Sequence, residues 1–345
     1  MTENLLFLDR NAVLACLAEA DLCAVVTRVL ERHARKCVTL PPECYLPWTN
    51  SEGAYCRALA MLGVIDSGKG PPLIGVKLIN AAVSNPAHDR ERAAGLSMVF
   101  DPETARPRAL AESGWLSAIR TAAYTMVGLR HLGPRGFHAV SIVGCGTLAR
   151  ARIDLLSREF PQAVDIHLYD SVPTRARALV DWIQRHHPQL AARTYGSART
   201  AVDAASVVVT TTTTSSGYLS ADWLAPGTFV AHVSLADLLS DAFETAQGLH
   251  VDDVELVTDN HRRILGRLIR EGRISADQDV GTAMSRRVLN GTLGQVLTGM
   301  RPAIRPSWGR VISNPFGMSV LDVALLSAVH QIAIGRGIGQ VLTLY

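Results

Sequence analysis

A short glycine-rich segment constrains the fold of this 345-residue chain more than any other feature. The apolar run 138–143 leads into Gly-Cys-Gly-Thr-Leu-Ala at 144–149, and a helical pattern follows to about residue 160. In such a segment Gly144 permits a tight turn, Gly146 lets the backbone approach a pyrophosphate, and Ala149 keeps helix and strand close. The N–H groups at the helix N-terminus favour phosphate. The segment predicts a dinucleotide site with contacts from Gly144, Cys145, Gly146, Thr147 and Leu148.

A carboxylate follows the next predicted strand. Asp170 ends the run 165–169 and lies 26 residues after Gly144. A carboxylate at this place hydrogen-bonds an adenosine ribose and repels a 2′-phosphate, so it favours NAD over NADP. Ser171 and Arg175 are further predicted contacts, and Arg175 could stack on adenine or weaken that preference. The alternative is a glycine turn in a parallel sheet followed by a surface aspartate.

The pattern of elements divides the chain into two domains. From about residue 137 to 313, continuous apolar strands alternate with helices, which predicts an α/β domain with a parallel sheet covered on both faces. The earlier part mixes strands with one long helix predicted over 11–35. A helix over 320–336 leaves the parallel sheet and is expected to return to the first part. We therefore expect a Rossmann-type NAD-binding domain at 118–315 and an α+β substrate domain made from 1–117 and 316–345.

Composition excludes several classes of protein. Hydrophobic residues make up 48% and charged residues 19% of the chain, which argues against intrinsic disorder. The net charge of +3 falls short of the excess typical of nucleic-acid binders. We find no uninterrupted apolar run of about 18 residues and no basic leader, so we expect a cytoplasmic protein with no membrane partner. The six cysteines and eleven histidines show no metal-ligand spacing, and no metal is expected.

Two further strand ends carry polar residues, and ligands of such sheets lie beyond these ends. Thr210, Thr211 and Thr212 could line the nucleotide cleft, although β-branched residues also simply favour strands. The second segment, His-Val-Ser-Leu-Ala-Asp at 232–237, contributes Ser234 as a cofactor contact and Asp237 as an acid or base beside nicotinamide. The alternative for Asp237 is a helix N-cap.

Three cations are candidates for binding an anionic substrate. Lys77 is the only charged residue in the apolar run 73–80, although such a lysine often extends outward to solvent. Arg120 lies in a helix of small residues, and Arg57 precedes an apolar run. Guanidinium groups bind carboxylates through two parallel hydrogen bonds. Together these cations would suit a dicarboxylate or an amino acid, but spacing alone does not show that they converge.

The chain resembles the ornithine cyclodeaminase/mu-crystallin family over nearly its whole length. The matching segments are GVKLI at 75–79, DPET at 101–104, RTAA at 120–123, IVGCG at 142–146, HVSLAD at 232–237 and NPFGM at 314–318. Within the family it is most similar to the branch that forms 2,3-diaminopropionate for siderophores or peptide natural products. The resemblance implies NAD-dependent oxidation of N-(2-amino-2-carboxyethyl)-L-glutamate, followed by imine hydrolysis to L-2,3-diaminopropionate and 2-oxoglutarate.

The resemblance also implies roles for individual residues. Lys77 and Arg120 fall on the residues that hold the substrate carboxylate, and Asp237 falls on the catalytic aspartate that acts on the imine or its attacking water. Met61 falls in a substrate-side motif, while Thr121 and Met318 fall beside the cofactor. The family forms homodimers through the domain that is not Rossmann-type.

One departure concerns the substrate half of the site. Relatives carry an arginine after Tyr-Leu, whereas here Tyr45-Leu46 is followed by Pro47-Trp48. Arg57 is a candidate replacement for that guanidinium. The change keeps three alternatives open: a cyclodeaminase that uses NAD catalytically, an imine reductase or amino-acid dehydrogenase acting on another amine, and a non-catalytic NAD-binding protein.

Overall fold

The computed structural model describes residues 4–260, 262–276 and 287–344. The chain divides into two compact units, one of Met1–Thr121 with Gly317–Tyr345 and the other of Ala122–Phe316. We call them unit 1 and unit 2. The first boundary falls inside helix α3 (Gly114–Leu132), which begins before the helix expected from residue 118.

Unit 1 contains a sheet of eight described strands in the order β17-β1-β7-β6-β5-β4-β2, with β3 also paired to β4. The central strands β4 to β7 are antiparallel neighbours, and β1 joins β7 in parallel. Sequence analysis missed β2, β3 and β17, which are short or, in β3, contain Pro47. The strands are β1 (Asn4–Leu8), β2 (Val38–Thr39), β3 (Cys44–Thr49), β4 (Tyr55–Ile65), β5 (Leu73–Ala82), β6 (Ala93–Phe100), β7 (Pro107–Glu112) and β17 (Gln340–Thr343).

The single helix predicted over 11–35 is wrong, because the segment forms α1 (Arg10–Glu19) and α2 (Leu22–Ala34). Ala20 is extended, with φ −85° and ψ 137°. The Asp21 side chain then accepts a hydrogen bond from the Ala24 N–H and begins α2 as its N-cap. An aspartate cap in the middle of an apolar pattern therefore starts a second helix. A 3₁₀ turn, η1 (Asn85–His88), lies between β5 and β6.

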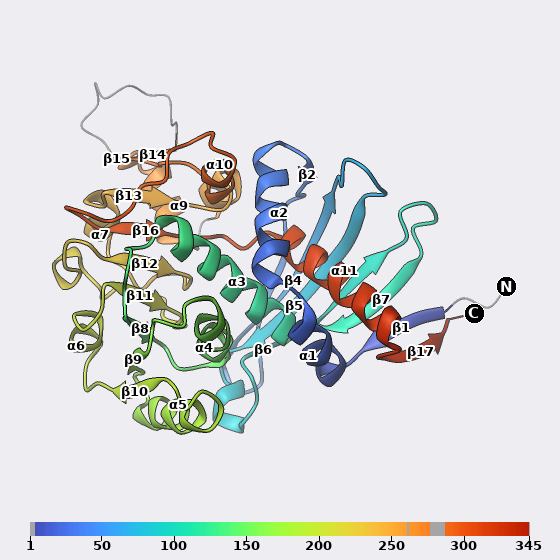
Figure 1. The fold of residues 1–345 in the computed structure, drawn as a ribbon, viewed down its shortest axis with the longest axis horizontal. Helices are drawn as coiled ribbons and strands as arrows, with labels where there is room; N and C mark the ends of the chain where they lie inside the picture. Colours follow the sequence, from blue (N-terminus) through green and yellow to red (C-terminus); the bar gives the residue numbers. More distant parts are fainter. Residues whose placement is uncertain (1–3, 261, 277–286, 345) are drawn as a thin grey trace. The chain divides into compact units, whose positions relative to one another are not determined.

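Helix α11 (Ser319–Arg336) packs on β4, β5 and β6 (Figure 1). Two glycines permit this close approach: a Cβ at Gly63 would lie 2.8 Å from Val320 Cγ1, and one at Gly75 would lie 3.0 Å from Val323 Cγ2. By length and composition α11 could cross a membrane, but 61% of it is buried inside the protein. That degree of burial is typical of a core helix.

Unit 2 contains a parallel sheet of seven described strands in the order β10-β9-β8-β11-β12-β16-β13. Because β9 and β11 flank β8 on opposite sides, the order reverses at β8, where Rossmann-type sheets bind dinucleotides. The predicted fold class is confirmed. The strands are β8 (Ala139–Val143), β9 (Asp165–Tyr169), β10 (Ala191–Thr194), β11 (Val207–Thr210), β12 (Phe229–His232), β13 (Gly248–His250) and β16 (Val311–Ser313).

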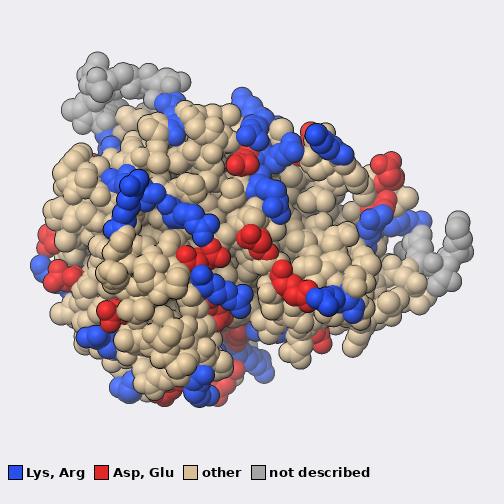
Figure 2. Space-filling model, in the orientation of Figure 1, with Lys and Arg blue, Asp and Glu red and all other residues tan. Residues whose placement is uncertain are grey.

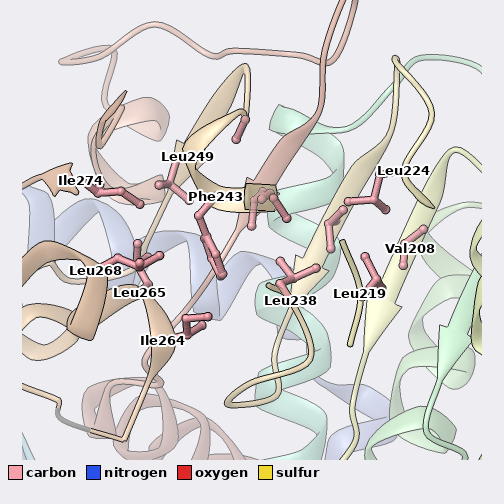
Figure 3. Packing of buried hydrophobic residues seen from close by; sticks show 14 of the residues in the cluster. Val208, Leu219, Leu224, Leu238, Phe243, Leu249, Ile264, Leu265, Leu268 and Ile274 are labelled. Carbon is pink, nitrogen blue, oxygen red and sulfur yellow. The ribbon is translucent and has the colours of Figure 1, made fainter. Parts of the chain in front are cut away.

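Short helices and a two-stranded ribbon complete unit 2. They are α4 (Thr147–Glu159), α5 (Pro173–His186), α6 (Ala198–Val202), η2 (Ala221–Trp223), α7 (Ser240–Glu244), α8 (Val254–Asp259), α9 (Ile264–Arg270), β14 (Ile274–Ser275), β15 (Arg287–Val288) and α10 (Leu293–Leu297). Figure 3 shows Phe243 packing among aliphatic side chains such as Leu249 and Leu265. On the face shown in Figure 2, both signs of charge are interspersed.

Candidate functional site

The glycine turn after β8 lies directly against the end of β11. Gly144 has φ +96°, and a Cβ there would lie 2.9 Å from the Thr211 carbonyl carbon and 3.0 Å from the Thr212 nitrogen. The Thr211 Oγ1 donates a hydrogen bond of 2.7 Å to the Gly144 carbonyl. Both the backbone conformation and the close contact require glycine. Thr211 therefore supports the turn, and its predicted contact with the cofactor stays a prediction.

The second glycine borders open space. A Cβ at Gly146 would meet nothing within 4 Å, and Gly146 is the N-cap of α4 without a capping side chain. Thr147 and Leu148 form the first turn of α4, whereas Ala149 is fully buried. Backbone N–H groups at an uncapped helix N-terminus bind phosphate groups. These residues fit the pyrophosphate of a dinucleotide.

Asp170 is held beside the same turn. Its Oδ2 accepts a hydrogen bond of 2.8 Å from the Cys145 N–H, and its Oδ1 accepts one of 2.9 Å from the Val172 N–H. Ser171 and Arg175 are exposed. Burial and the neighbouring Asp170 raise the pKa of the Cys145 thiol to about 12, so the thiol stays neutral. The carboxylate therefore lies where an adenosine ribose is expected.

Thr210 and Ser234 face each other inside unit 2. The two hydroxyl oxygens are 2.7 Å apart, and both side chains are buried. Both residues were predicted to contact the cofactor. Their hydrogen bond joins the end of β11 to the segment that follows β12, and their contact with the cofactor stays a prediction.

Asp237 is completely buried, and its two carboxylate oxygens differ. Oδ1 accepts hydrogen bonds of 2.8 Å from Thr212 Oγ1 and 2.8 Å from the Tyr218 hydroxyl. Oδ2 has no hydrogen-bond partner among the described residues. Burial and the nearby Asp237 raise the pKa of Tyr218, which keeps its hydroxyl protonated as a donor. The N-cap alternative for Asp237 is wrong, because Leu239 occupies that position of α7.

Tyr218 was missed by sequence analysis, since a single tyrosine in a turn carries no recognisable signal.

A second buried pair joins the segments 232–237 and 314–318. Asn314 Nδ2 lies 2.8 Å from both His232 Nδ1 and the His232 carbonyl. Burial, reinforced by Arg263, lowers the pKa of His232 to about 3, so the imidazole is neutral.

In unit 1, Lys77 and Arg120 share one carboxylate that sequence analysis also missed. Asp322 Oδ2 lies 3.2 Å from Lys77 Nζ and 3.0 Å from Arg120 Nε. All three side chains are buried. Burial and the nearby Arg120 lower the pKa of Lys77 to about 8, while Asp322 opposes that shift. The sequence signal that could have indicated this residue is that Asp322 is the one acidic residue of helix α11.

The sheet of unit 1 brings Arg57, Met61 and Lys77 to one face. Met61 lies directly opposite Lys77 across β4 and β5, and Arg57 lies four residues before Met61 on the same strand. Since side chains alternate along a strand, all three point to the face that α11 covers. Met61 is buried, while Arg57 is partly exposed.

Two residues predicted to lie beside the cofactor have other contacts. Thr121 Oγ1 donates a hydrogen bond of 2.7 Å to the Ser117 carbonyl within α3. Met318 is fully buried in unit 1 as the N-cap of α11. Neither observation provides evidence for a cofactor contact.

Comparison with known proteins places these residues in a family. The family model for the ornithine cyclodeaminase/mu-crystallin family matches residues 6–336. A Staphylococcus aureus enzyme named N-((2S)-2-amino-2-carboxyethyl)-L-glutamate dehydrogenase is 28% identical over 349 residues and is covered in full, as is this chain.

Solved structures agree with that match. The crystal structure of a protein named CmnK is 49% identical, with a TM-score of 0.92 over 99% of each chain. An archaeal alanine dehydrogenase dimer with bound NAD is 21% identical, with a TM-score of 0.81, and the alignment covers 99% of this chain and 100% of the other. This chain belongs to the ornithine cyclodeaminase/mu-crystallin family.

Proposed function

We propose that the chain oxidises N-(2-amino-2-carboxyethyl)-L-glutamate with NAD and hydrolyses the resulting imine to L-2,3-diaminopropionate and 2-oxoglutarate. The chain is an NAD-dependent oxidoreductase that acts on the C–N bond of an amino acid. The observation that most supports this particular substrate is the match, over the full length of both chains, to the staphylococcal dehydrogenase of that compound. A biosynthetic role in siderophores or peptide natural products is part of the proposal.

The residues of unit 2 would hold the cofactor. The 144–148 loop and the N-terminus of α4 would bind the pyrophosphate, and Asp170 the adenosine ribose. When bound, NAD supplies the acceptor for the hydride that leaves the substrate. Asp237 would take a proton from water at its unpartnered Oδ2, because Thr212 and Tyr218 already occupy Oδ1.

The buried cations of unit 1 would bind the substrate. Lys77 and Arg120 carry two positive charges against the single negative charge of Asp322. The Arg120 Nε faces Asp322, whereas its two terminal nitrogens make no hydrogen bond to a described residue and can bind a carboxylate. Fixing a carboxylate next to the reacting carbon orients that carbon, a contribution worth several kcal/mol in catalysis.

A decisive assay follows NADH at 340 nm with this compound as substrate and identifies the products by mass spectrometry. We expect NADH, 2-oxoglutarate and 2,3-diaminopropionate in equal amounts. Absence of NADH, with NAD still bound, would reject this substrate. It would favour a dehydrogenase of another amine, in line with Pro47 on β3, which pairs with Arg57 on β4.

We also propose a cytoplasmic homodimer formed through unit 1. The face of its sheet opposite α11 exposes large apolar side chains from four neighbouring strands, namely Leu46, Trp48, Leu62, Leu78 and Leu96. A continuous apolar face of this kind marks an interface, and two copies of one face can pack about a two-fold axis.

Replacing Leu62, 52% exposed in the centre of that face, with glutamate is expected to convert the dimer to monomers. Burying a charge in a sheet-to-sheet interface is strongly unfavourable. Sedimentation equilibrium should then report 37.2 kDa in place of twice that mass. Val164→Glu, a matched apolar-to-acid change on unit 2, should leave the dimer intact. An unchanged mass for Leu62→Glu would contradict this interface.

A further inference from the structure

Tyr218 contacts Asp237 through both its backbone and its side chain. Its hydroxyl donates a hydrogen bond of 2.8 Å to Asp237 Oδ1, and its N–H donates one of 3.0 Å to the Asp237 carbonyl. The N–H of Leu219 donates a second hydrogen bond, of 2.9 Å, to the same carbonyl. One segment of the chain therefore fixes both the backbone of Asp237 and the direction of its carboxylate.

Gly217 lets this segment pass close to the loop that holds Asp237. A Cβ at Gly217 would lie 3.0 Å from the Leu238 carbonyl oxygen, so a larger residue would push the two segments apart. Leu219 and Leu238 then pair as a parallel β-bridge. The backbone on both sides of Tyr218 is therefore fixed against the loop that its side chain contacts.

The Tyr218 ring is also supported by its own neighbours. It packs against Trp223 of η2, with ring centroids 6.1 Å apart, and the Arg199 guanidinium lies 5.7 Å from the centroid of the Trp223 ring. Thr212 Oγ1 donates the second hydrogen bond, of 2.8 Å, to Asp237 Oδ1. Two hydroxyl donors on one oxygen oppose rotation of the carboxylate, which would exchange its two oxygens.

This arrangement gives the two oxygens of the buried carboxylate different roles. Oδ1 accepts both hydroxyl hydrogen bonds, whereas Oδ2 has no hydrogen-bond partner among the described residues and can accept a proton. Burial raises the pKa of the Tyr218 hydroxyl, and Asp237 adds to this shift. Two further titratable groups, Tyr169 and Asp170, act on Tyr218 in the same direction, so its hydroxyl stays a neutral donor.

We propose that Tyr218 is a positioning residue for Asp237, which with Thr212 holds Oδ1 so that Oδ2 receives the proton of the attacking water. The inference rests on the proposed function. In that step a water O–H bond breaks and its proton goes to Oδ2. The water oxygen forms a bond to the carbon of the protonated imine, and the C=N electron pair moves to the nitrogen.

Loss of the Tyr218 hydroxyl would affect this step in two ways. Oδ1 would keep one donor in place of two, so the carboxylate could rotate away from the productive direction. A carboxylate that loses a hydrogen-bond donor also binds a proton more readily, and a protonated Asp237 cannot act as the base. Both effects lower turnover without altering the residues that would hold NAD.

The test compares two variants that each remove one donor. Tyr218→Phe and Thr212→Val are each expected to lower kcat about 10-fold, the effect of losing one hydrogen bond to a charged group. The acid limb of the pH profile of kcat/KM, which reports the base, should move to higher pH by about 0.5–1 unit. Thr212→Ser keeps a hydroxyl and should restore most of the activity and the position of the limb. The Kd for NADH should stay unchanged in all three variants.

Tyr195→Phe is the matched control, because it removes another hydrogen-bonded tyrosine hydroxyl from unit 2. That hydroxyl lies 2.7 Å from His167 Nδ1. The control should keep the kcat and the pH profile of the wild type. Wild-type kcat in Tyr218→Phe would overturn the proposal. A lower kcat with an unmoved acid limb would overturn it as well, since that result indicates only a structural role for Tyr218.

Failure of the proposed function gives a different result, because the wild type itself then forms no NADH from the glutamate substrate. Titration of the Asp237 carboxyl carbon by ¹³C NMR tests the role of Tyr218 without turnover. The Asp237 signal is identified as the one that Asp237→Asn removes. We expect this signal to titrate at a higher pH in Tyr218→Phe than in the wild type. The same midpoint in both proteins would overturn the proposal.

Discussion

Asp237→Asn is expected to lower kcat by about 10²- to 10⁴-fold, the usual contribution of a positioned general acid or base. Asparagine keeps an oxygen that can accept the hydrogen bonds of Thr212 and Tyr218. It places a nitrogen that cannot accept a proton where Oδ2 now lies without a partner. The Kd for NAD should not change, because the hydrogen bonds that hold the 144–148 turn and Asp170 do not involve Asp237.

Turnover and NAD binding must therefore be measured on the same preparation, by the 340 nm assay and by fluorescence titration of NADH. Asp222→Asn, an exposed carboxylate elsewhere in unit 2, is the matched control and should retain full activity. An Asp237→Asn variant with unchanged kcat would remove this residue from the mechanism. A variant that loses NAD binding as well would instead indicate a structural role.

The fold of unit 2 was predictable because its signals are local. The strand, turn and helix around Gly144 lie within about 25 residues, and every requirement of the turn is a property of its own backbone. Unit 1 was harder to predict. Its helix break depends on one capping residue, Asp21, and its strand β17 is stabilised by pairing with β1, more than 300 residues earlier in the chain. Pairing across such a separation leaves little signal in either segment.

The same distinction between local signals and contacts of distant segments applies to the residues of the candidate site. Asp170 and the glycine loop follow from spacing, whereas Asp322 and Tyr218 become visible only when the chain is folded. Asp322 meets Lys77 across 245 residues of sequence. The hydrogen bond between Thr210 and Ser234, 24 residues apart in the chain, likewise becomes visible only in the folded structure.

Asp322→Asn is expected to make substrate binding strongly dependent on pH. Burial, Arg120 and Arg57 lower the pKa of Lys77 to about 8, and Asp322 is the neighbouring group that raises it. Without that negative charge the pKa of Lys77 falls further, so Lys77 is neutral at pH 8 and binds carboxylates poorly. If the pKa falls by about one unit, the protonated fraction of Lys77 at pH 8 drops from about one half to about one eleventh, so we expect KM to rise about 5-fold relative to the wild type. The ratio should return towards one as the pH falls and Lys77 regains its proton.

The measurement is the KM ratio of variant to wild type between pH 6 and 9, which cancels the titration of the substrate's own amines. The lowered pKa of Lys77, about 8, lies within this range, so the titration of Lys77 should appear in the ratio. Breaking a buried ion pair also costs about 3–5 kcal/mol of stability, so Tm should fall. Glu19→Gln, which removes an exposed partner of Arg336 on α11, should change neither quantity appreciably. A raised KM ratio that stays constant with pH would show that Asp322 fixes the geometry of the site without setting the charge of Lys77.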